Sequence, residues 1–567
     1  NTAVGYQSLD ANTTGNYNAA MGVDALGANT TASNNVAIGY QASKSSTTAD
    51  MNVAIGRNAL YTNVNGDRNV AIGDYALYTM NPSGDVDTAN VAVGKNAMYA
   101  TTTGTFNTAL GYNIMEANTT GARNVAVGGY ALDANTTGND NVALGYAALG
   151  ASTTAAQNVA IGNYALDAST TAGDNTAVGH EALSANTSGA QNTGVGHRVL
   201  ISNTTGSGLS GFGVGTLTYN TTGNYNSAFG RLALNANTTA HDNCAFGFKA
   251  LTANTTGYYN VGVGNSALAA NTSAIKNTAL GYRALADNTT GHRNTAAGTD
   301  ALLNNTTGAY NSAFGQDAMG LNTTGANNTA LGRATLYTNS TGSNNVAIGY
   351  NALNANQTAN DNVAIGYRTL VANTTGTSNV GVGASALAAN TTGDKNTALG
   401  WHALDSNTTA DKNTAFGYNT LETNTTGTRN TAVGSGALST INADDNTAVG
   451  SNCGDAITSG ARNTAVGSYA LTTATTSSDT CAFGKDALKN VTTTSGNNAF
   501  GKDALLTLST GDNNCAFGTY TLDAATTTQW TVAMGNYAGT DVTTASQCTL
   551  VGYEAGENIT TGDANTC

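Results

Sequence analysis

The sequence predicts an all-β fold, a parallel β-solenoid of about 33 coils with a 17-residue repeat. Three observations predict it. A glycine recurs every 17 residues, an apolar residue always stands directly before that glycine, and the 567-residue chain contains one proline. Internal repeats of fixed length are the signature of solenoid architectures. We number the positions of the repeat as slots 1 to 17, so that slot and residue number agree in the first copy.

The glycine of slot 5 sets the register of the whole chain. It stands at Gly5, Gly22, Gly39 and Gly56 in the first four copies. From Gly94 to Gly434 every step is 17 residues, whereas the step to Gly94 is 21 and the step after Gly434 is 16. We therefore expect a single continuous repeat array over residues 1–567. It would carry a four-residue insertion near 79–87 and variant coils, with an apolar slot 12, from 434 to 567.

Composition favours short strands joined by turns. Charged residues make up 10% of the chain, and glycine, threonine and asparagine fill most polar slots. A glycine in every copy opposes a helix, while the fixed apolar slots oppose disorder. Short β-prone runs bounded by glycine and asparagine are typical of strands. We expect each coil to contain two short strands and two turns and to hydrogen-bond to the next coil.

The charge distribution excludes several partners. The net charge is −14 and no basic stripe is present, so we expect no nucleic-acid partner. No stretch is long and apolar enough to span a bilayer.

The chain begins and ends within a copy of the repeat, which favours a section of a longer repeat protein or end-to-end association by strand addition.

Strand alternation predicts which slots face the interior of a coil. Slots 2 and 4 share one face of a strand, and slots 3 and 5 share the other. Because slot 4 is always apolar, we expect slots 2 and 4 to pack inward against the leucine of slot 9. Alanine and glycine in slots 3 and 5 would then face outward. Such small residues indicate either the close approach of another backbone or a turn of positive φ. A core this thin favours lateral association, for example as a trimer.

Asparagine occupies slot 1 in nearly every copy, as at Asn1, Asn18, Asn35 and Asn52. Stacked identical asparagines can form amide ladders along the axis of a cross-β stack, and asparagine is also favoured in turns. Both interpretations are structural.

Slot 12 has a second interpretation, because Asn-X-Ser/Thr is also the acceptor motif for N-linked sugar. Late copies carry residues such as Ile441, Val491 and Leu508 in this slot. This pattern favours an inward ladder that includes Asn12, Asn118 and Asn135. Glycosylation is the alternative, and its candidate acceptors are Asn254, Thr13, Thr14, Thr119 and Thr136.

The segments Asn52–Leu60, NVAIGRNAL, and Asn345–Leu353, NVAIGYNAL, resemble the head repeats of YadA-like trimeric autotransporter adhesins and similar repeats of phage tail fibres. The resemblance covers slots 1 to 9 of nearly every copy. It implies a left-handed parallel β-roll, three chains side by side, and a surface-exposed fibre. The chain departs from that pattern in its longer coil and in having neither a heptad stalk nor an anchor barrel.

Candidate chemistry is sparse. We find no paired-carboxylate column, nucleophile elbow or phosphate loop, and we predict no enzyme, cofactor or metal site. His180 and His197 stand in slot 6 of adjacent copies without a carboxylate or cysteine column beside them. Tyrosines recur in slot 6, where an aromatic stripe could bind a surface glycan, a receptor or another fibre. Most of the six cysteines are interpreted as small core residues.

These observations predict a structural subunit of an extracellular or cell-surface fibre, which is a stiff rod of stacked β-coils that associates with itself. The alternative is the shaft of an adhesin or a phage tail fibre, which would present a receptor-binding tip absent from this chain. Localisation would then be the cell surface or a virion fibre.

Overall fold

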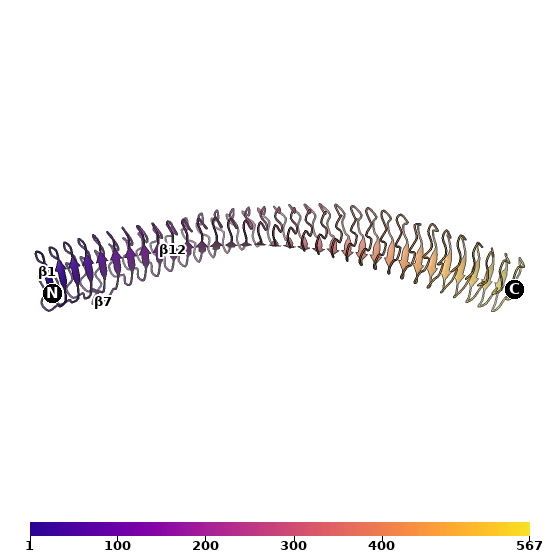
Figure 1. Ribbon diagram of the computed structural model, residues 1–567, viewed down its shortest axis with the longest axis horizontal. Helices are drawn as coiled ribbons and strands as arrows, with labels where there is room; N and C mark the ends of the chain where they lie inside the picture. Colours follow the sequence, from indigo (N-terminus) through magenta and orange to yellow (C-terminus); the bar gives the residue numbers. More distant parts are fainter. The chain divides into compact units, whose positions relative to one another are not determined.

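The computed structural model describes residues 1–567 as two units, Asn1–Arg283 and Ala284–Cys567. Both units are built in the same way. Each coil places a three-residue strand at slots 2 to 4 and returns through a series of turns, as the row of short arrows and loops shows (Figure 1). No helix is present. The prediction of an all-β parallel β-solenoid with a 17-residue repeat is confirmed.

The strands follow the repeat through both units. Unit Asn1–Arg283 contains β1 (Thr2–Val4), β2 (Ala19–Met21), β3 (Val36–Ile38), β4 (Val53–Ile55), β5 (Gly66–Asp67), β6 (Val70–Ile72), β7 (Val86–Asp87), β8 (Val91–Val93), β9 (Thr108–Leu110), β10 (Val125–Val127), β11 (Val142–Leu144), β12 (Val159–Ile161), β13 (Thr176–Val178), β14 (Thr193–Val195), β15 (Ser210–Phe212), β16 (Ser227–Phe229), β17 (Cys244–Phe246), β18 (Val261–Val263) and β19 (Thr278–Leu280). Unit Ala284–Cys567 contains β20 (Thr295–Ala297), β21 (Ser312–Phe314), β22 (Thr329–Leu331), β23 (Val346–Ile348), β24 (Val363–Ile365), β25 (Val380–Val382), β26 (Thr397–Leu399), β27 (Thr414–Phe416), β28 (Thr431–Val433), β29 (Thr447–Val449), β30 (Thr464–Val466), β31 (Cys481–Phe483), β32 (Asn498–Phe500), β33 (Cys515–Phe517), β34 (Val532–Met534) and β35 (Thr549–Val551).

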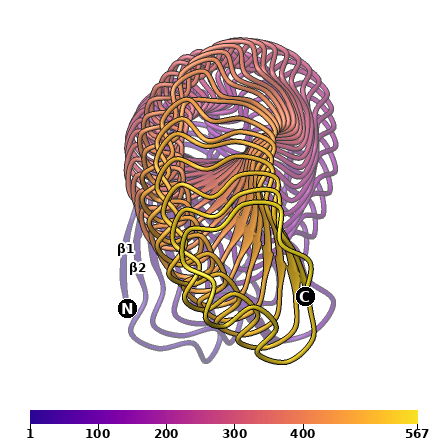
Figure 2. The ribbon, with the colours of Figure 1, turned by 90° about the vertical axis from the view of Figure 1, so that its right-hand side faces the viewer.

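Within each unit, successive coils stack in parallel with identical slots in register. In β10 and β11, for example, Ala126 lies opposite Ala143, and the residues of slots 2 and 4 pair in the same way. Figure 2 looks along the stack and shows the loops of successive coils lying one behind another. Every side chain therefore belongs to a column formed by one slot.

Nearly every coil contains one strand, not the two expected; only the two coils beside the insertion contain a second, β5 and β7. The rest of the coil is a series of turns, but its backbone still bonds to the neighbouring coils. The Leu132 N–H donates to the Ala148 carbonyl at 3.0 Å, and the Thr136 N–H donates to the Thr153 carbonyl at 2.8 Å. The stacking register is thus held by hydrogen bonds around the whole coil.

The turns depend on left-handed backbone at three slots besides the glycine of slot 5. In the coil that contains β10, Tyr130 in slot 7, Leu132 in slot 9 and Asp140 in slot 17 have φ of 61°, 51° and 58°. Such a conformation costs a residue with a side chain roughly 1–2 kcal/mol. Glycine relieves that cost where it replaces the leucine of slot 9, as at Gly454 and Gly539.

The predicted faces of the strand are reversed. Ala126 in slot 3 and Ala131 in slot 8 are completely buried with Leu132, while Val125 in slot 2 is 38% exposed and Val127 in slot 4 is half-buried. The interior of a coil has room for two alanines and one leucine. The larger apolar residues of slots 2 and 4 therefore point outward.

The glycine column meets two requirements together. Gly145 has φ of 136°, which only glycine adopts readily. A Cβ added there would lie 2.6 Å from the carbonyl carbon and oxygen of Gly162. Both interpretations of slot 5 therefore hold, and the backbone that approaches closely is the next coil of the same chain.

The insertion near 79–87 enlarges one coil without interrupting the stack. β6 and β8 on either side of it pair directly. The extra residues turn back so that β7 pairs in parallel with β5, while Pro82 is buried and residues 83–87 are exposed. As for membranes, the fold offers no helix with the length and apolarity that a bilayer crossing requires.

We predict that Gly145→Ala destabilises its unit by at least ~2 kcal/mol, because the new Cβ adds left-handed strain and overlaps the Gly162 carbonyl. The matched control is Gly150→Ala in the same coil, whose Cβ would meet the end of the Asp167 side chain at 3.0 Å and the Ala147 carbonyl oxygen at 3.3 Å. Denaturant unfolding of both variants measures the difference. Equal losses would contradict the close approach as the cause.

Candidate functional site

The slot 1 asparagines form a ladder in which each side chain serves two coils, and it is interrupted where slot 1 holds another residue, as at Leu209. The Oδ1 of Asn124 accepts the backbone N–H of Asn141 in the next coil at 2.9 Å. The Nδ2 of Asn124 donates to the carbonyl of Gly138, in slot 15 of its own coil, at 2.9 Å. The same pattern joins Asn18 to Asn1 and Asn35 to Asn18, each at 2.8–2.9 Å, and reaches Asn52. The predicted asparagine ladder is confirmed.

The slot 12 asparagines form a second ladder that meets the first at slot 15. Asn271 donates from Nδ2 to the Oδ1 of Asn254 at 2.8 Å. Asn254 itself donates to the Gly257 carbonyl at 2.9 Å, and Asn243 of slot 1 donates to the same oxygen at 2.9 Å. The two ladders thus satisfy both lone pairs of one buried carbonyl, as burial of polar groups requires.

The predicted acceptor Asn254 is completely buried, so its amide is inaccessible to a sugar-transferring enzyme in the folded coil. Asn118 and Asn135 are likewise buried, and Asn135 donates to the Oδ1 of Asn118 at 2.8 Å. In the first two coils, the Oδ1 of Asn12 accepts a hydrogen bond from the Nδ2 of Asn29 at 2.8 Å.

The slot 12 ladder is interrupted, and its ends differ in how they are satisfied. Asn424 is followed by Ile441, and its Oδ1 accepts the backbone N–H of Gly427 in its own coil at 3.1 Å. Asn135 is followed by Ser152, and there the Oδ1 of Asn135 and the hydroxyl of Ser152 both lack a partner. Ser169, in the next coil, also has an unpartnered hydroxyl.

The late coils replace the ladder with apolar packing. Ile441, Ile457, Val491, Leu508 and Val542 are completely buried in slot 12. Where slot 9 is glycine, the slot 12 side chain occupies the space that a leucine would fill. A Cβ at Gly454 would lie 3.0 Å from Cδ1 of Ile457. An apolar residue here removes the need for amide partners, so either solution is compatible with burial.

The threonines of slots 13 and 14 have different environments. Thr119 donates from its hydroxyl to the Thr136 carbonyl at 2.9 Å, and Thr136 continues the column to Thr153 at 3.0 Å. Thr13 does the same with Thr30 at 2.9 Å. Thr14 in slot 14 is exposed. Of the predicted threonine acceptors, those of slot 13 are engaged in the stack, whereas slot 14 faces solvent.

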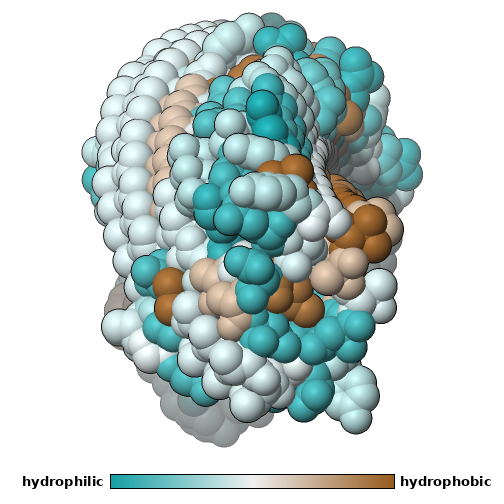
Figure 3. All heavy atoms as spheres, turned by 90° about the vertical axis from the view of Figure 1, so that its left-hand side faces the viewer, coloured by the Kyte–Doolittle hydropathy of each residue, from teal (hydrophilic) through white to brown (hydrophobic).

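An apolar face runs along the strands of both units. We define it as the side chains of slots 2 and 4: slot 4 is apolar in every coil, slot 2 is valine, threonine or another small uncharged residue, and no side chain in either slot is charged. Slot 4 exposes Leu110 by 48% and Leu331 by 49%. Phe212, Phe229 and Phe246 stack in consecutive coils with ring centroids 4.6 and 4.5 Å apart. Seen from the N-terminal end, hydrophobic residues gather at the surface on the right of the view (Figure 3).

The cysteines divide between the core and this apolar face. Cys244, Cys481 and Cys515 occupy slot 2 and are half-buried. They therefore face outward, contrary to the expectation that most cysteines are core residues. Cys453 and Cys548 are buried. Burial raises the pKa of the Cys453 thiol to about 12. All six cysteines are free.

An aromatic ladder follows slots 6 and 7 in unit Asn1–Arg283. We define it as six rings whose neighbouring centroids lie 5.5–6.3 Å apart. It thus extends the single pair His180–His197 noted in the sequence, and it consists of Tyr112, Tyr130, Tyr146, Tyr164, His180 and His197. The stripe of slot 6 noted in the sequence does not account for the whole ladder, because Tyr130 and Tyr164 come from slot 7. The left-handed backbone of slot 7 turns these side chains toward the same surface.

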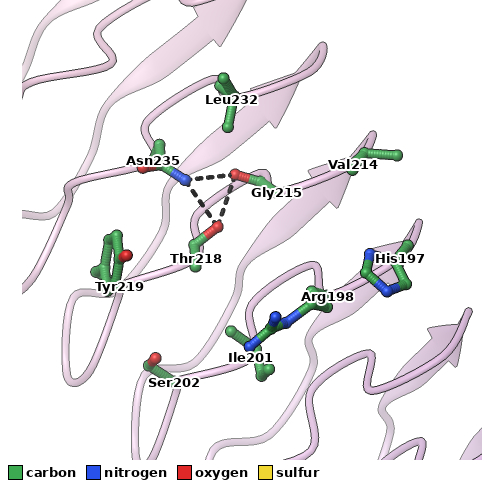
Figure 4. A pocket seen from close by; sticks show the side chains of 10 residues that line it. All are labelled: His197, Arg198, Ile201, Ser202, Val214, Gly215, Thr218, Tyr219, Leu232 and Asn235. Carbon is green, nitrogen blue, oxygen red and sulfur yellow. Dashed lines mark hydrogen bonds between the residues drawn. The ribbon is translucent and has the colours of Figure 1, made fainter.

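A groove lies between the slot 7 column and the residues of slots 10 and 11. One part of it is a hollow of about 410 Å³ at the end of the aromatic ladder. The hollow exists because Gly215 provides no side chain in slot 7, and its walls include Arg198 and Tyr219 (Figure 4). Asn235 closes one side, where its Nδ2 donates to the Gly215 carbonyl and the Thr218 hydroxyl, both at 2.8 Å. Arg198 pairs with Glu181 at 3.2 Å.

Asp167 lines the groove from slot 10, and Asp133 occupies the same slot two coils away, close to Tyr130. Asp133 and Asp167 are half-buried, and burial raises the pKa of each carboxyl; for Asp133 the nearby Glu116 adds to the effect. A second hollow of about 340 Å³ lies against Asp167, Tyr164 and Glu181. No group of three or more histidine, cysteine, aspartate or glutamate side chains is arranged to hold a metal ion.

Comparison with known proteins adds no family. No protein-family model matches the chain, and no curated protein shows significant similarity to it.

We predict that Ser152→Asn combined with Ser169→Asn stabilises unit Asn1–Arg283, by about 1–3 kcal/mol for each buried group that gains a partner. The new amides would give Asn135 its missing donor and join it to the ladder that begins at Asn186. Thermal and denaturant unfolding measure the gain, with Ser184→Asn in the half-exposed slot 10 as control. A gain from the control alone would contradict the ladder as its source.

The insertion predicts a pH dependence. Burial, together with the neighbouring Asp85 and Asp50 carboxylates, raises the pKa of Asp67 to about 6. A carboxyl whose pKa is higher in the folded state favours folding at low pH, and stability falls as pH rises from about 4 through 6. We expect Asp67→Asn, which keeps the acceptor for the Asp50 N–H, to raise the melting temperature at pH 7 and to leave it unchanged at pH 4.

The matched control for this titration is Asp512→Asn. Asp512 occupies the same slot and accepts the Ser495 N–H at 2.8 Å, but no insertion lies beside it. An equal gain at pH 7 from Asp512→Asn would show that the effect does not arise from the carboxylates of the insertion.

Proposed function

We propose that this chain is a structural subunit of a fibre outside the cell or on its surface, in which solenoids associate side by side through the apolar face. The observation that carries the proposal is the uncharged apolar face itself. It recurs in coil after coil of both units and leaves residues such as Leu110 and Leu331 about half exposed. Extended apolar surfaces of this kind mark interaction sites.

The stacking supports a mechanical role. Backbone hydrogen bonds join every coil to its neighbours within a unit, and buried asparagine ladders reinforce them. In a solenoid, stability is the sum of such nearest-neighbour terms, so length can increase without a new kind of core. A coil with so thin an interior gains further burial if its outward valines, leucines and phenylalanines are covered by another chain.

The identity of the covering chain follows from the repeat. A second copy presents the same spacing along its axis, so side chains from two apolar faces can interdigitate over many coils. The resemblance to YadA-like head repeats implies three chains, and a homotrimer is therefore the first assembly to test. The same resemblance supports the alternative function, the shaft of an adhesin or tail fibre whose receptor-binding tip lies in another segment or subunit.

We expect the triple variant Phe212→Glu, Phe229→Glu, Phe246→Glu to weaken self-association, because three carboxylates would have to be desolvated at the interface. Light scattering after gel filtration gives the mass relative to 56.7 kDa for one chain. The control places the same charges in the exposed slot 14 of the same coils, as Thr222→Glu, Thr239→Glu and Thr256→Glu. Circular dichroism verifies that both variants retain the β fold.

A wild-type chain that remains monomeric at high concentration would refute the lateral assembly. Electron microscopy of the wild-type protein provides an independent measurement. Bundled or multi-stranded rods support the fibre, whereas dispersed single rods that carry a distinct particle at one end would support the adhesin or tail-fibre alternative.

A further inference from the structure

The aromatic ladder is not required by the fold. Its rings lie in slots 6 and 7, which in other coils carry asparagine, serine or arginine, as at Asn96, Ser266 and Arg333. Tyr112, Tyr146 and Tyr164 are 47%, 46% and 40% exposed. Edge-to-face contacts between the rings contribute roughly 0.5–1.5 kcal/mol each, yet they leave ring surface open to solvent. Six consecutive aromatic side chains therefore need another explanation.

The ladder and the groove combine two kinds of contact along one line. The tyrosines offer flat apolar surfaces. The half-buried Asp167 beside Tyr164, and Asp133 close to Tyr130, offer hydrogen-bond acceptors. Hydrogen-bonding groups placed against apolar and aromatic walls are the usual composition of a ligand site. A chain of sugar rings matches this composition, because its C–H faces stack on aromatic rings while its hydroxyls donate to carboxylates.

The repeat also sets a spacing along the axis. Tyr112 and Tyr146 both occupy slot 6 two coils apart, which corresponds to ~10 Å at the spacing of neighbouring strands. This is about the length of two linked sugar residues in an extended glycan. A linear glycan lying along the axis could therefore place two sugars of alternate positions over Tyr112 and Tyr146, and the sugars offset by one position over Tyr130 and Tyr164 of slot 7.

The charges of the groove favour a neutral ligand. Glu116, Asp133 and Asp167 would repel an acidic polysaccharide. Of the cations beside the ladder, Arg198 is already paired with Glu181 at 3.2 Å, and the ammonium of Lys95 lies over the ring of Tyr112, 5.9 Å from its centroid. Burial that raises the pKa of Asp133 and Asp167 means that their surroundings stabilise the charged carboxylate poorly. These carboxyl groups suit hydrogen bonds to hydroxyls better than they suit strong attraction of a cation.

We propose that the aromatic ladder and the adjoining groove, from Tyr112 to the hollow beside Tyr219, bind a neutral linear glycan along the solenoid axis. Sugar rings lie against Tyr112, Tyr146 and Tyr164, and their hydroxyls donate to Asp133 and Asp167. The hollow at Gly215 receives the end of the bound segment or a branch. This site lies on slots 6 to 11 and is separate from the apolar face, so the inference does not rest on the fibre proposal.

The test measures binding of neutral hexasaccharides to the full chain by titration calorimetry. The probes are β-1,4-linked glucose, α-1,4-linked glucose and β-1,4-linked N-acetylglucosamine. We expect at least one to bind, and Tyr146→Ala with Tyr164→Ala to raise its Kd tenfold or more. The same positions changed to phenylalanine retain the rings and should stay within about threefold of wild type, since tenfold corresponds to about 1.4 kcal/mol.

Two controls make the result specific. Tyr225→Ala removes a tyrosine that is 66% exposed but lies in slot 17, outside the groove, and should leave Kd unchanged. Asp167→Ala should raise the Kd, while its melting temperature should stay close to that of the wild type. The proposal fails if no neutral hexasaccharide binds at millimolar concentration, if Tyr225→Ala weakens binding as much as the double alanine variant, or if only an oligolysine peptide binds at these tyrosines.

Discussion

The hydrogen-bonded contact between one coil and the next is the constraint on which the rest of the structure depends. Because most backbone groups find their partners about one repeat away, every slot stacks on a copy of itself. A column must therefore tolerate its own repetition at the distance between neighbouring strands. Glycine in slot 5, alanine in slot 3 and asparagine in slot 1 meet that condition. A glycine column allows carbonyls to approach, an alanine column fills a thin interior, and an asparagine column bonds to itself.

The sequence predicts whatever depends on repetition. The period leads to the β-solenoid, and the late change of slot 12 to residues such as Ile441 correctly predicts that Asn254 and its equivalents point inward. The slot 1 ladder could be predicted for the same reason, because an amide stacked on an amide can bond in either direction along the axis. Each of these inferences needs only the knowledge that identical slots are neighbours.

What could not be predicted depends on the shape of one coil. Alternation alone assigns the larger apolar side chains to the interior, yet Val125 and Val127 point outward because the cross-section accepts only residues such as Ala126, Ala131 and Leu132. The left-handed conformation of Leu132 opposes its local preference, and inter-coil bonds such as Leu132 N–H to Ala148 override that preference. The groove was also missed, since slot 7 joins the aromatic ladder only through this unusual backbone.

The arrangement separates three surfaces that a more compact fold would have to combine. Slots 2 and 4 carry the apolar face, slots 6 to 11 carry the aromatic ladder and groove, and slot 14 carries exposed threonine. Since the coil interior is satisfied by alanine, leucine and the paired asparagines, none of these surfaces is needed to hold a single coil together. Variation in them changes what the solenoid contacts with little effect on how it stacks. Two changes illustrate this division. Where slot 12 changes from Asn424 to Ile441 in the next coil, the N–H of Gly427 donates to the Asn424 amide oxygen that has lost its partner. Slot 6, by contrast, changes from Tyr146 to His180 two coils later without any rearrangement of the strands.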